Sequence, residues 1–173
     1  ADPLRYYCLA KTPPFTDGDF SEDKFIETYN SDLANGLGNL VSRIAKLVSD
    51  SPYDTKQLTD DSENQLWTDV KEELDNFRFD KACETIWLSI RTLDRYLEKN
   101  APWTKLGNNL ADLKHAVTVL RKIAYSLQPF LPETAEKILK QFSSDKIRLC
   151  VFLGHLFYIA PANNAFPSSL PAV

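Results

Sequence analysis

Apolar residues recur at every third or fourth position along most of this chain, and this spacing limits the fold more than any other feature. In residues 21–50 they are Phe25, Tyr29, Leu33, Leu37, Leu40, Ile44, Leu47 and Val48. Such a period places them on one face of a helix. The same spacing predicts further helices over residues 63–76, 79–99, 109–127 and 132–142. No alternating pattern of useful length indicates a strand, so the sequence predicts an all-α bundle of about five helices.

Residues that favour helix ends bound these segments. Ser21 is a preferred N-cap residue, and the acidic Glu22 follows it in the first turn. Asn100 and then Pro102 indicate the end of the third predicted helix, because asparagine tolerates the C-terminal cap and proline cannot continue a helix. Pro132 suits the first turn of the last one.

Several classes of site leave no trace in the sequence. It has no glycine-rich phosphate loop, Gly-x-Ser-x-Gly elbow or His-Glu-x-x-His helix, so we expect no catalytic residue. The cysteines Cys8, Cys83 and Cys150 are far apart and have no histidine at ligand spacing, so we expect no metal site. No apolar run reaches about 18 residues, and charge interrupts the longest, residues 147–160; we expect no membrane span.

Cysteine usage and the chain ends suggest the setting of the chain. An odd number of scattered cysteines fits a reducing compartment, so we expect a cytoplasmic protein. Methionine is absent even at position 1, which leads us to expect a piece of a longer reading frame. Residues 161–173 are rich in Pro, Ala and Ser and are predicted to form an unpacked tail.

Charge is distributed unevenly along the chain, whose formal net charge is −4. Residues 1–77 hold 7 Lys and Arg against 16 Asp and Glu, whereas residues 78–125 hold 9 against 5. The middle of the chain could therefore face a polyanion such as nucleic acid. The alternative interpretation is charge segregation that only keeps a helical bundle in solution.

The run from Asn35 to Asn39 places poor helix formers inside the first predicted helix. A glycine there costs about 1 kcal/mol relative to alanine. Gly36 lies near the edge of the apolar face, where we expect its missing side chain to let another helix approach. Asn35, Asn39 and Arg43 form one polar stripe at intervals of four. Their donors and acceptors suit the edge of an extruded base, and a plain solvated surface is the alternative.

A tryptophan directly after a proline follows the third predicted helix. Trp103 either plugs the end of the bundle or stands exposed as a platform on which a base could stack. Pro102 favours the platform, because a proline beyond a helix end limits the freedom of the loop.

Five segments of the chain, in the same order, resemble the methionyl-tRNA synthetases. They are Leu4–Tyr7, Asp17–Ser21, Tyr29–Arg43, Ala101–Trp103 and Leu127–Ala135. The run from 17 to 43 is the most specific of them. The chain departs from the family after about residue 144, where a Leu-Phe-Pro-Arg-Ile-like segment is replaced by Leu156–Ile159.

The resemblance implies a division of the chain and a partner. Residues 1–20 would be the end of the catalytic region with its tRNA stem-contact segment, and residues 21–160 the helical anticodon-binding domain of class I synthetase type. The partner would be methionine tRNA with its CAU anticodon. The parent would be an ATP-dependent ligase with its catalytic motifs upstream, and we expect no cofactor in this chain.

The resemblance also assigns roles to residues. Recognition of the first anticodon base would use Asn35, Asn39, Arg43, Pro102 and Trp103. Trp103 would stack on the cytosine, and the polar stripe would form hydrogen bonds with its edge.

Three function classes remain at this point. The first is a tRNA anticodon-binding module from a methionine-specific synthetase; the valine, leucine, isoleucine and cysteine synthetases share the helical architecture, although the run from 17 to 43 favours methionine. A helical protein-interaction module that has lost RNA binding would fit the negative net charge. A complete enzyme with an unrecognised site is the third.

Overall fold

Helices account for nearly all of the chain that the computed structural model describes, which comprises residues 1–12, 18–51, 64–104 and 110–142. They are α1 (Asp2–Lys11), α2 (Glu22–Thr28), the π-helix η1 (Tyr29–Gly38), α3 (Asn39–Ser49), α4 (Gln65–Asp75), α5 (Phe79–Asn100), the 3-10 turn η3 (Pro102–Thr104), α6 (Leu110–Ser126) and α7 (Pro132–Gln141). These ranges contain no strand, which confirms the all-α prediction.

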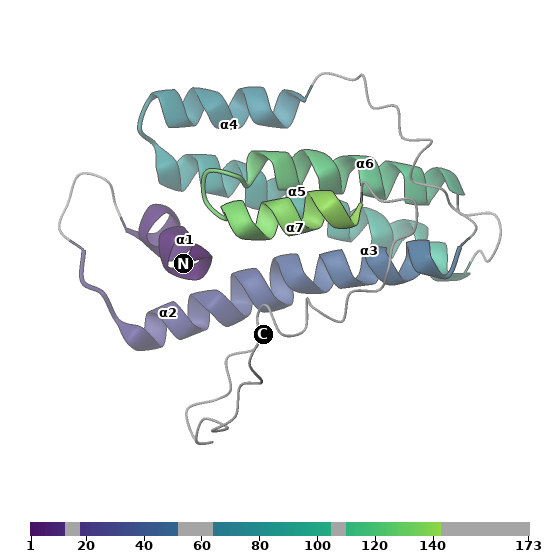
Figure 1. Ribbon diagram of the computed structural model, residues 1–173, viewed down its shortest axis with the longest axis horizontal. Coiled ribbons are helices and arrows are strands. Elements are labelled where there is room, and N and C mark those ends of the chain that lie inside the picture. The colour runs from purple at the N-terminus through teal and green to yellow at the C-terminus, as the bar shows by residue number, and fades with distance from the viewer. Residues whose placement is uncertain (13–17, 52–63, 105–109, 143–173) are drawn as a thin grey trace.

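The helices pack around one apolar core. The segments α2, η1 and α3 run end to end as a single rod along one side of the bundle (Figure 1). Helix α5 packs against α4 and α6, and α7 packs against α6. Leucine, isoleucine and valine side chains from η1, α3, α5 and α6 fill the space between them. Within the described ranges, no helix combines the length and the apolar character needed to cross a membrane; the apolar run 147–160 lies outside them.

The five predicted helices correspond to α2–η1–α3, α4, α5, α6 and α7. Each predicted end lies within two residues of the observed one. Ser21 caps the first of them as predicted, since its Oγ accepts a hydrogen bond from the backbone N–H of Lys24 at 3.5 Å. Proline stands in the first turn of α7, also as predicted. Helix α1 was not predicted, because its sequence lacks a long apolar stripe.

The long predicted helix changes its hydrogen-bond pattern at η1. The N–H of Asn39 donates to the carbonyl of Ala34, five residues back, as in a π-helix. At Gly36, a Cβ would lie 3.3 Å from the carbonyl oxygen of Ser31 in the same helix. That contact is tighter than normal packing. The prediction that Gly36 admits a neighbouring helix is therefore wrong: among the described residues, the close approach comes from its own backbone.

Helix α1 is held by polar and aromatic contacts to three other elements. The ring of Tyr6 stacks on Trp87 of α5, with centroids 4.7 Å apart. The Tyr6 hydroxyl donates to Asp32 of η1 at 2.8 Å, and Lys11 forms an ion pair with the same carboxylate at 3.0 Å. At the start of α1, the buried Asp2 accepts from the backbone N–H of Thr134 in α7 at 2.9 Å.

Asp32 is the polar centre of this attachment. Its side chain is only 19% exposed. Burial by itself would raise the pKa of Asp32, but hydrogen bonds from Lys11, Tyr6 and Ser31 outweigh burial and hold the pKa below its ordinary value. The pKa of Tyr6 is raised, first by burial and then by the charge of Asp32. The ionised carboxylate therefore stabilises the contact between α1 and η1.

We predict that Asp32→Asn lowers the free energy of unfolding at neutral pH by about 1–3 kcal/mol, because the hydrogen bonds lose a charged acceptor. Since the folded carboxyl has the lower pKa, its contribution is present above the unfolded value of about 3.9 and is lost as the pH falls through the folded pKa. Urea unfolding of both proteins from pH 7 to pH 3 should show their difference shrinking with acid.

Asp75→Asn is the matched control, because the Asp75 carboxylate is 61% exposed and, among the described residues, pairs only with Lys71 in the preceding helical turn. Exposed pairs of this kind contribute little to stability. A difference between the native protein and Asp32→Asn that stays constant over the pH range would contradict the role given to the Asp32 charge.

Candidate nucleic-acid interface

Residues from three elements meet around the side chain of Arg43. This arginine lies on α3, and its Cζ is 5.6 Å from the centroid of the Trp103 ring in η3. Its Nη1 donates to Oδ1 of Asp94 on α5 at 2.5 Å. The fold thus brings together two predicted site residues that are far apart in sequence. We call Arg43, Asp94 and Trp103 the Arg43 cluster.

The turn after α5 presents Trp103 to solvent. Ala101 ends the helix in the left-handed conformation, with φ of 42°, and the chain then turns into η3. Pro102 is buried, whereas Trp103 remains 44% exposed. The proline, and not the tryptophan, is thus the residue that packs inward. This geometry favours the platform interpretation of Trp103 over the plug.

The two asparagines of the polar stripe face solvent. Asn35 lies in η1 and Asn39 opens α3, and both side chains are exposed. Among the described residues, neither amide has a hydrogen-bond partner. Each amide therefore keeps its donors and its acceptor available to a ligand. Arg43 follows one turn later in the same rod, so the stripe leads toward Trp103.

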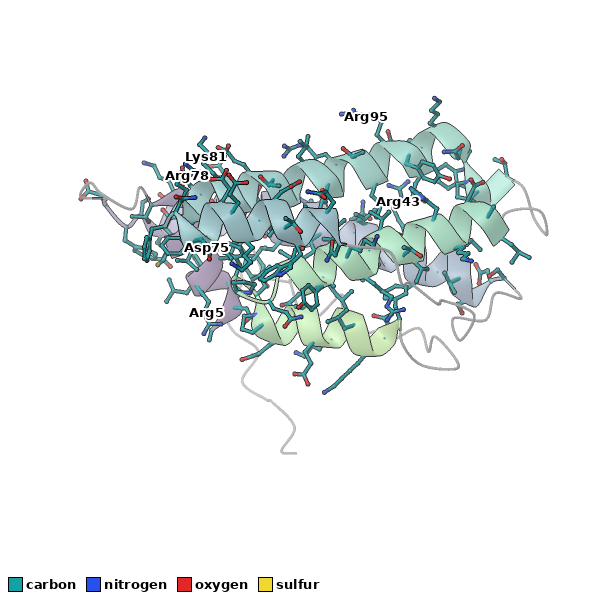
Figure 2. All side chains as sticks on the ribbon, turned by 90° about the horizontal axis from the view of Figure 1, so that it is seen from above. Arg5, Arg43, Asp75, Arg78, Lys81 and Arg95 are labelled. Carbon is teal, nitrogen blue, oxygen red and sulfur yellow. The ribbon has the colours of Figure 1, made fainter. Side chains whose placement is uncertain are left out.

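The basic residues of α5 and of its N-cap position, Arg78, divide into two groups. Arg78 pairs with Glu73, and Lys81 pairs with Glu84. In contrast, Arg91, Arg95 and Lys99 are exposed and have no ion pair with any described residue. Figure 2 shows Arg95 in the same half of the bundle as Arg43, and Arg78 and Lys81 in the other half.

Arg91, Arg95 and Lys99 form what we call the basic stripe. They are spaced by four residues on one helix, so they lie on one side of it. The stripe runs along α5 toward the turn that carries Trp103. Exposed cations on the helix that leads to an exposed aromatic ring are features that suit a single-stranded nucleic acid. Lys105, the next basic residue along the chain, lies outside the described residues.

The described residues suggest no metal site, and their two free cysteines are the exposed Cys8 and the buried Cys83. The described residues contain no group of histidine, cysteine and acidic side chains that could hold a metal ion. Cys83 is buried, and its burial raises the pKa of the thiol to about 12, which suppresses the nucleophilic thiolate. Cys150 lies outside the described residues.

Sequence reasoning did not find Asp94. The carboxylate is 51 residues from Arg43 in the chain and lies in a segment with many charged side chains. Only the packing of α5 beside the rod brings the two together. Knowledge of which faces of two helices meet would have been needed to predict the pair.

Two family models match the chain. One is described as the anticodon-binding domain of tRNA ligase and matches residues 62–154, more than half of the chain. The other is described as tRNA synthetases class I (M) and matches residues 1–45. Arg43 lies within the second match, and Trp103 within the first.

The chain is also similar to whole proteins of known name. The methionine–tRNA ligase of Fusobacterium nucleatum subsp. nucleatum is 35% identical over 164 residues, which cover 84% of this chain and 25% of that protein. The methionine–tRNA ligase of Clostridium acetobutylicum is 35% identical over an aligned length of 161 residues. That match covers 82% of this chain and 24% of that protein. The chain thus spans about a quarter of the length of these relatives.

A solved structure of Mycobacterium tuberculosis methionyl-tRNA synthetase in complex with methionyl-adenylate matches with a TM-score of 0.71 and 26% identity. The match covers 81% of this chain and 31% of that one.

The exposure of Trp103 predicts that its ring contributes little to folding. Trp103→Ala should lower the free energy of unfolding by less than about 1 kcal/mol, because it loses an exposed cation–π contact. Trp87→Ala is the control: this ring is 9% exposed and stacks on Tyr6, so its loss should cost about 3–5 kcal/mol. Thermal unfolding of both variants measures the contrast. Equal losses would show that Trp103 is a structural plug.

Proposed function

The chain belongs to the family of anticodon-binding domains of tRNA ligases, of the kind found in methionyl-tRNA synthetases, and from this premise we propose that it recognises the CAU anticodon of methionine tRNA. The observation that carries the proposal is the Arg43 cluster beside the exposed stripe of Asn35 and Asn39. Stacking and hydrogen-bonding groups lie together there on one surface, as recognition of an unpaired base requires.

The side chains divide the recognition of the first base between them. The exposed face of Trp103 supplies a stacking surface, and the buried Pro102 fixes the turn that presents it. Cytosine offers an amino group as donor and its N3 and O2 atoms as acceptors. The guanidinium of Arg43 can donate to those acceptors, and an amide oxygen of Asn35 or Asn39 can accept from the amino group.

The basic stripe is suited to the phosphates that flank the base. Arg91, Arg95 and Lys99 are exposed and unpaired within the described residues, so contact with phosphate would displace no existing ion pair. Contacts of this kind add affinity without reading sequence. Specificity would therefore come from the polar stripe and the Arg43 cluster.

We propose a wider role for the protein that contains this chain. It would attach methionine to its tRNA in the cytoplasm with ATP, by catalytic residues outside these 173 positions. Residues 1–20 would join that catalytic part to an anticodon-binding domain over residues 21–160, followed by a tail over 161–173. A sister specificity for valine, leucine, isoleucine or cysteine tRNA is an outcome that tRNA binding experiments would reveal.

We predict that Arg43→Ala and Arg95→Ala weaken tRNA binding in different ways. Loss of a base contact at Arg43 should reduce the binding free energy of CAU tRNA by about 1–3 kcal/mol. The reduction should be much smaller for a tRNA whose first anticodon base is changed. Loss of a phosphate contact at Arg95 should weaken both tRNAs equally and reduce the salt dependence of binding. Titration of both tRNAs at several salt concentrations, with the full-length protein, measures this.

Two outcomes would contradict this assignment. An equal loss for both tRNAs in Arg43→Ala would make Arg43 a phosphate contact. A native protein that binds CAU tRNA no better than the tRNA with a changed first base would overturn the proposed function itself.

Trp103 gives a separate prediction about affinity. Trp103→Ala should weaken binding of CAU tRNA roughly ten- to a hundredfold, since stacking contributes about 1–3 kcal/mol per base. Trp103→Phe keeps an aromatic face and should retain part of the affinity. Binding that is unchanged in Trp103→Ala, in a sample with a native melting temperature, would remove the stacking role.

A further inference from the structure

The side chain of Arg43 is held in place from two directions. Asp94 accepts a hydrogen bond from its Nη1 at 2.5 Å, and the Trp103 ring lies 5.6 Å from its Cζ. The arginine side chain is 30% exposed and that of Asp94 is 41% exposed, so the pair lies at the surface within reach of a ligand. The guanidinium carries further N–H donors beyond the one that Asp94 uses.

Asp94 has other cations nearby, but it pairs with Arg43. Arg91 lies three residues before it on α5 and Arg95 directly follows, yet neither forms an ion pair with any described residue. The carboxylate instead reaches across to α3 and bonds an arginine 51 positions away. The contact thus fixes a basic side chain that, among the described residues, also faces the Trp103 ring.

A held arginine is better prepared to read a base than a free one. Arginine has one of the most flexible side chains, and ordering it during binding weakens affinity. A carboxylate partner orders the side chain before the ligand arrives, and the planar guanidinium then presents its remaining donors in a fixed direction. This gain requires that Asp94 remain bonded to Arg43 in the complex.

We infer that Asp94 is a positioning residue for base recognition, which holds Arg43 so that its free donors meet the acceptors of a cytosine at the first anticodon position. The inference rests on the proposed function, because it gives Asp94 a role only if Arg43 reads a base. In this role Asp94 acts through its hydrogen bond with Arg43 and needs no contact with RNA.

The charge of Asp94 makes the inference easy to distinguish from a general electrostatic effect. A carboxylate beside RNA repels phosphates, so removal of the charge alone should strengthen binding of every tRNA. Loss of positioning should instead weaken binding of the CAU tRNA selectively. The two explanations predict changes of opposite sign for the same variant.

The test compares Asp94→Ala, Asp94→Asn and a control, Glu84→Ala, in the full-length protein. Glu84→Ala removes the same charge from the same helix, but the Glu84 carboxylate is 66% exposed and, among the described residues, pairs only with Lys81. We expect Asp94→Ala to reduce discrimination between CAU tRNA and a tRNA with a changed first base by roughly three- to thirtyfold. Asp94→Asn keeps an oxygen that accepts from Arg43 and should retain part of the discrimination, and Glu84→Ala should leave it unchanged.

Two further measurements separate positioning from simple damage. In the double variant Arg43→Ala with Asp94→Ala, discrimination should fall no further than in Arg43→Ala alone, because Asp94 acts through Arg43. Without tRNA, the side-chain N–H signals of Arg43 in an NMR spectrum should broaden or exchange faster in Asp94→Ala than in the native protein. Melting temperatures of all variants show that each is folded.

The results of these measurements either support the positioning role of Asp94 or overturn it. Discrimination that is unchanged in Asp94→Ala, or affinities that rise equally for both tRNAs, would overturn it while leaving the proposed function intact. Additive losses in the double variant would also overturn it. If the native protein itself fails to discriminate, the proposed function fails first. A selective loss in Asp94→Ala, partly restored in Asp94→Asn, supports the positioning role.

Discussion

The apolar seam between the rod α2–η1–α3 and the helices α5 and α6 is the contact on which the rest of the structure depends. Four residues of the rod are at most 1% exposed along this seam: Leu33, Leu37, Leu40 and Ile44. Because those residues must face inward, the rotation of the rod about its own axis is fixed. The same rotation turns Asn35 and Asn39 to solvent and brings Arg43 to the rim, beside Asp94 and Trp103.

Periodicity predicted the helices of the bundle because their apolar faces are encoded locally. It missed α1, whose buried residues Tyr6 and Asp2 contact Trp87 and Thr134, far away in the chain. It also missed the change to a π-helix, since a change of hydrogen-bond partner by one residue leaves the apolar spacing almost the same. Within the π-helical segment, a Cβ added at Gly36 would lie 3.3 Å from the Ser31 carbonyl oxygen, five residues back, and the apolar spacing gives no sign of this.

The residues of the candidate site were predicted in part from their chemistry and in part from a family resemblance. Spacing alone left the polar stripe and Trp103 open to a structural interpretation. The burial of Pro102 and the exposure of Trp103 favour the binding interpretation of the turn after α5. Asp94 could not be predicted from the sequence, because its identity as a partner depends on the relative placement of two helices.

The attachment of α1 has a mechanical consequence. This helix is fixed to η1 through Asp32, to α5 through Trp87 and to α7 through the backbone of Thr134. Because these contacts reach three different elements, α1 can be displaced only if contacts to the rod, to α5 and to α7 all break. A load applied to α1 would therefore be shared between the rod and two other helices of the bundle.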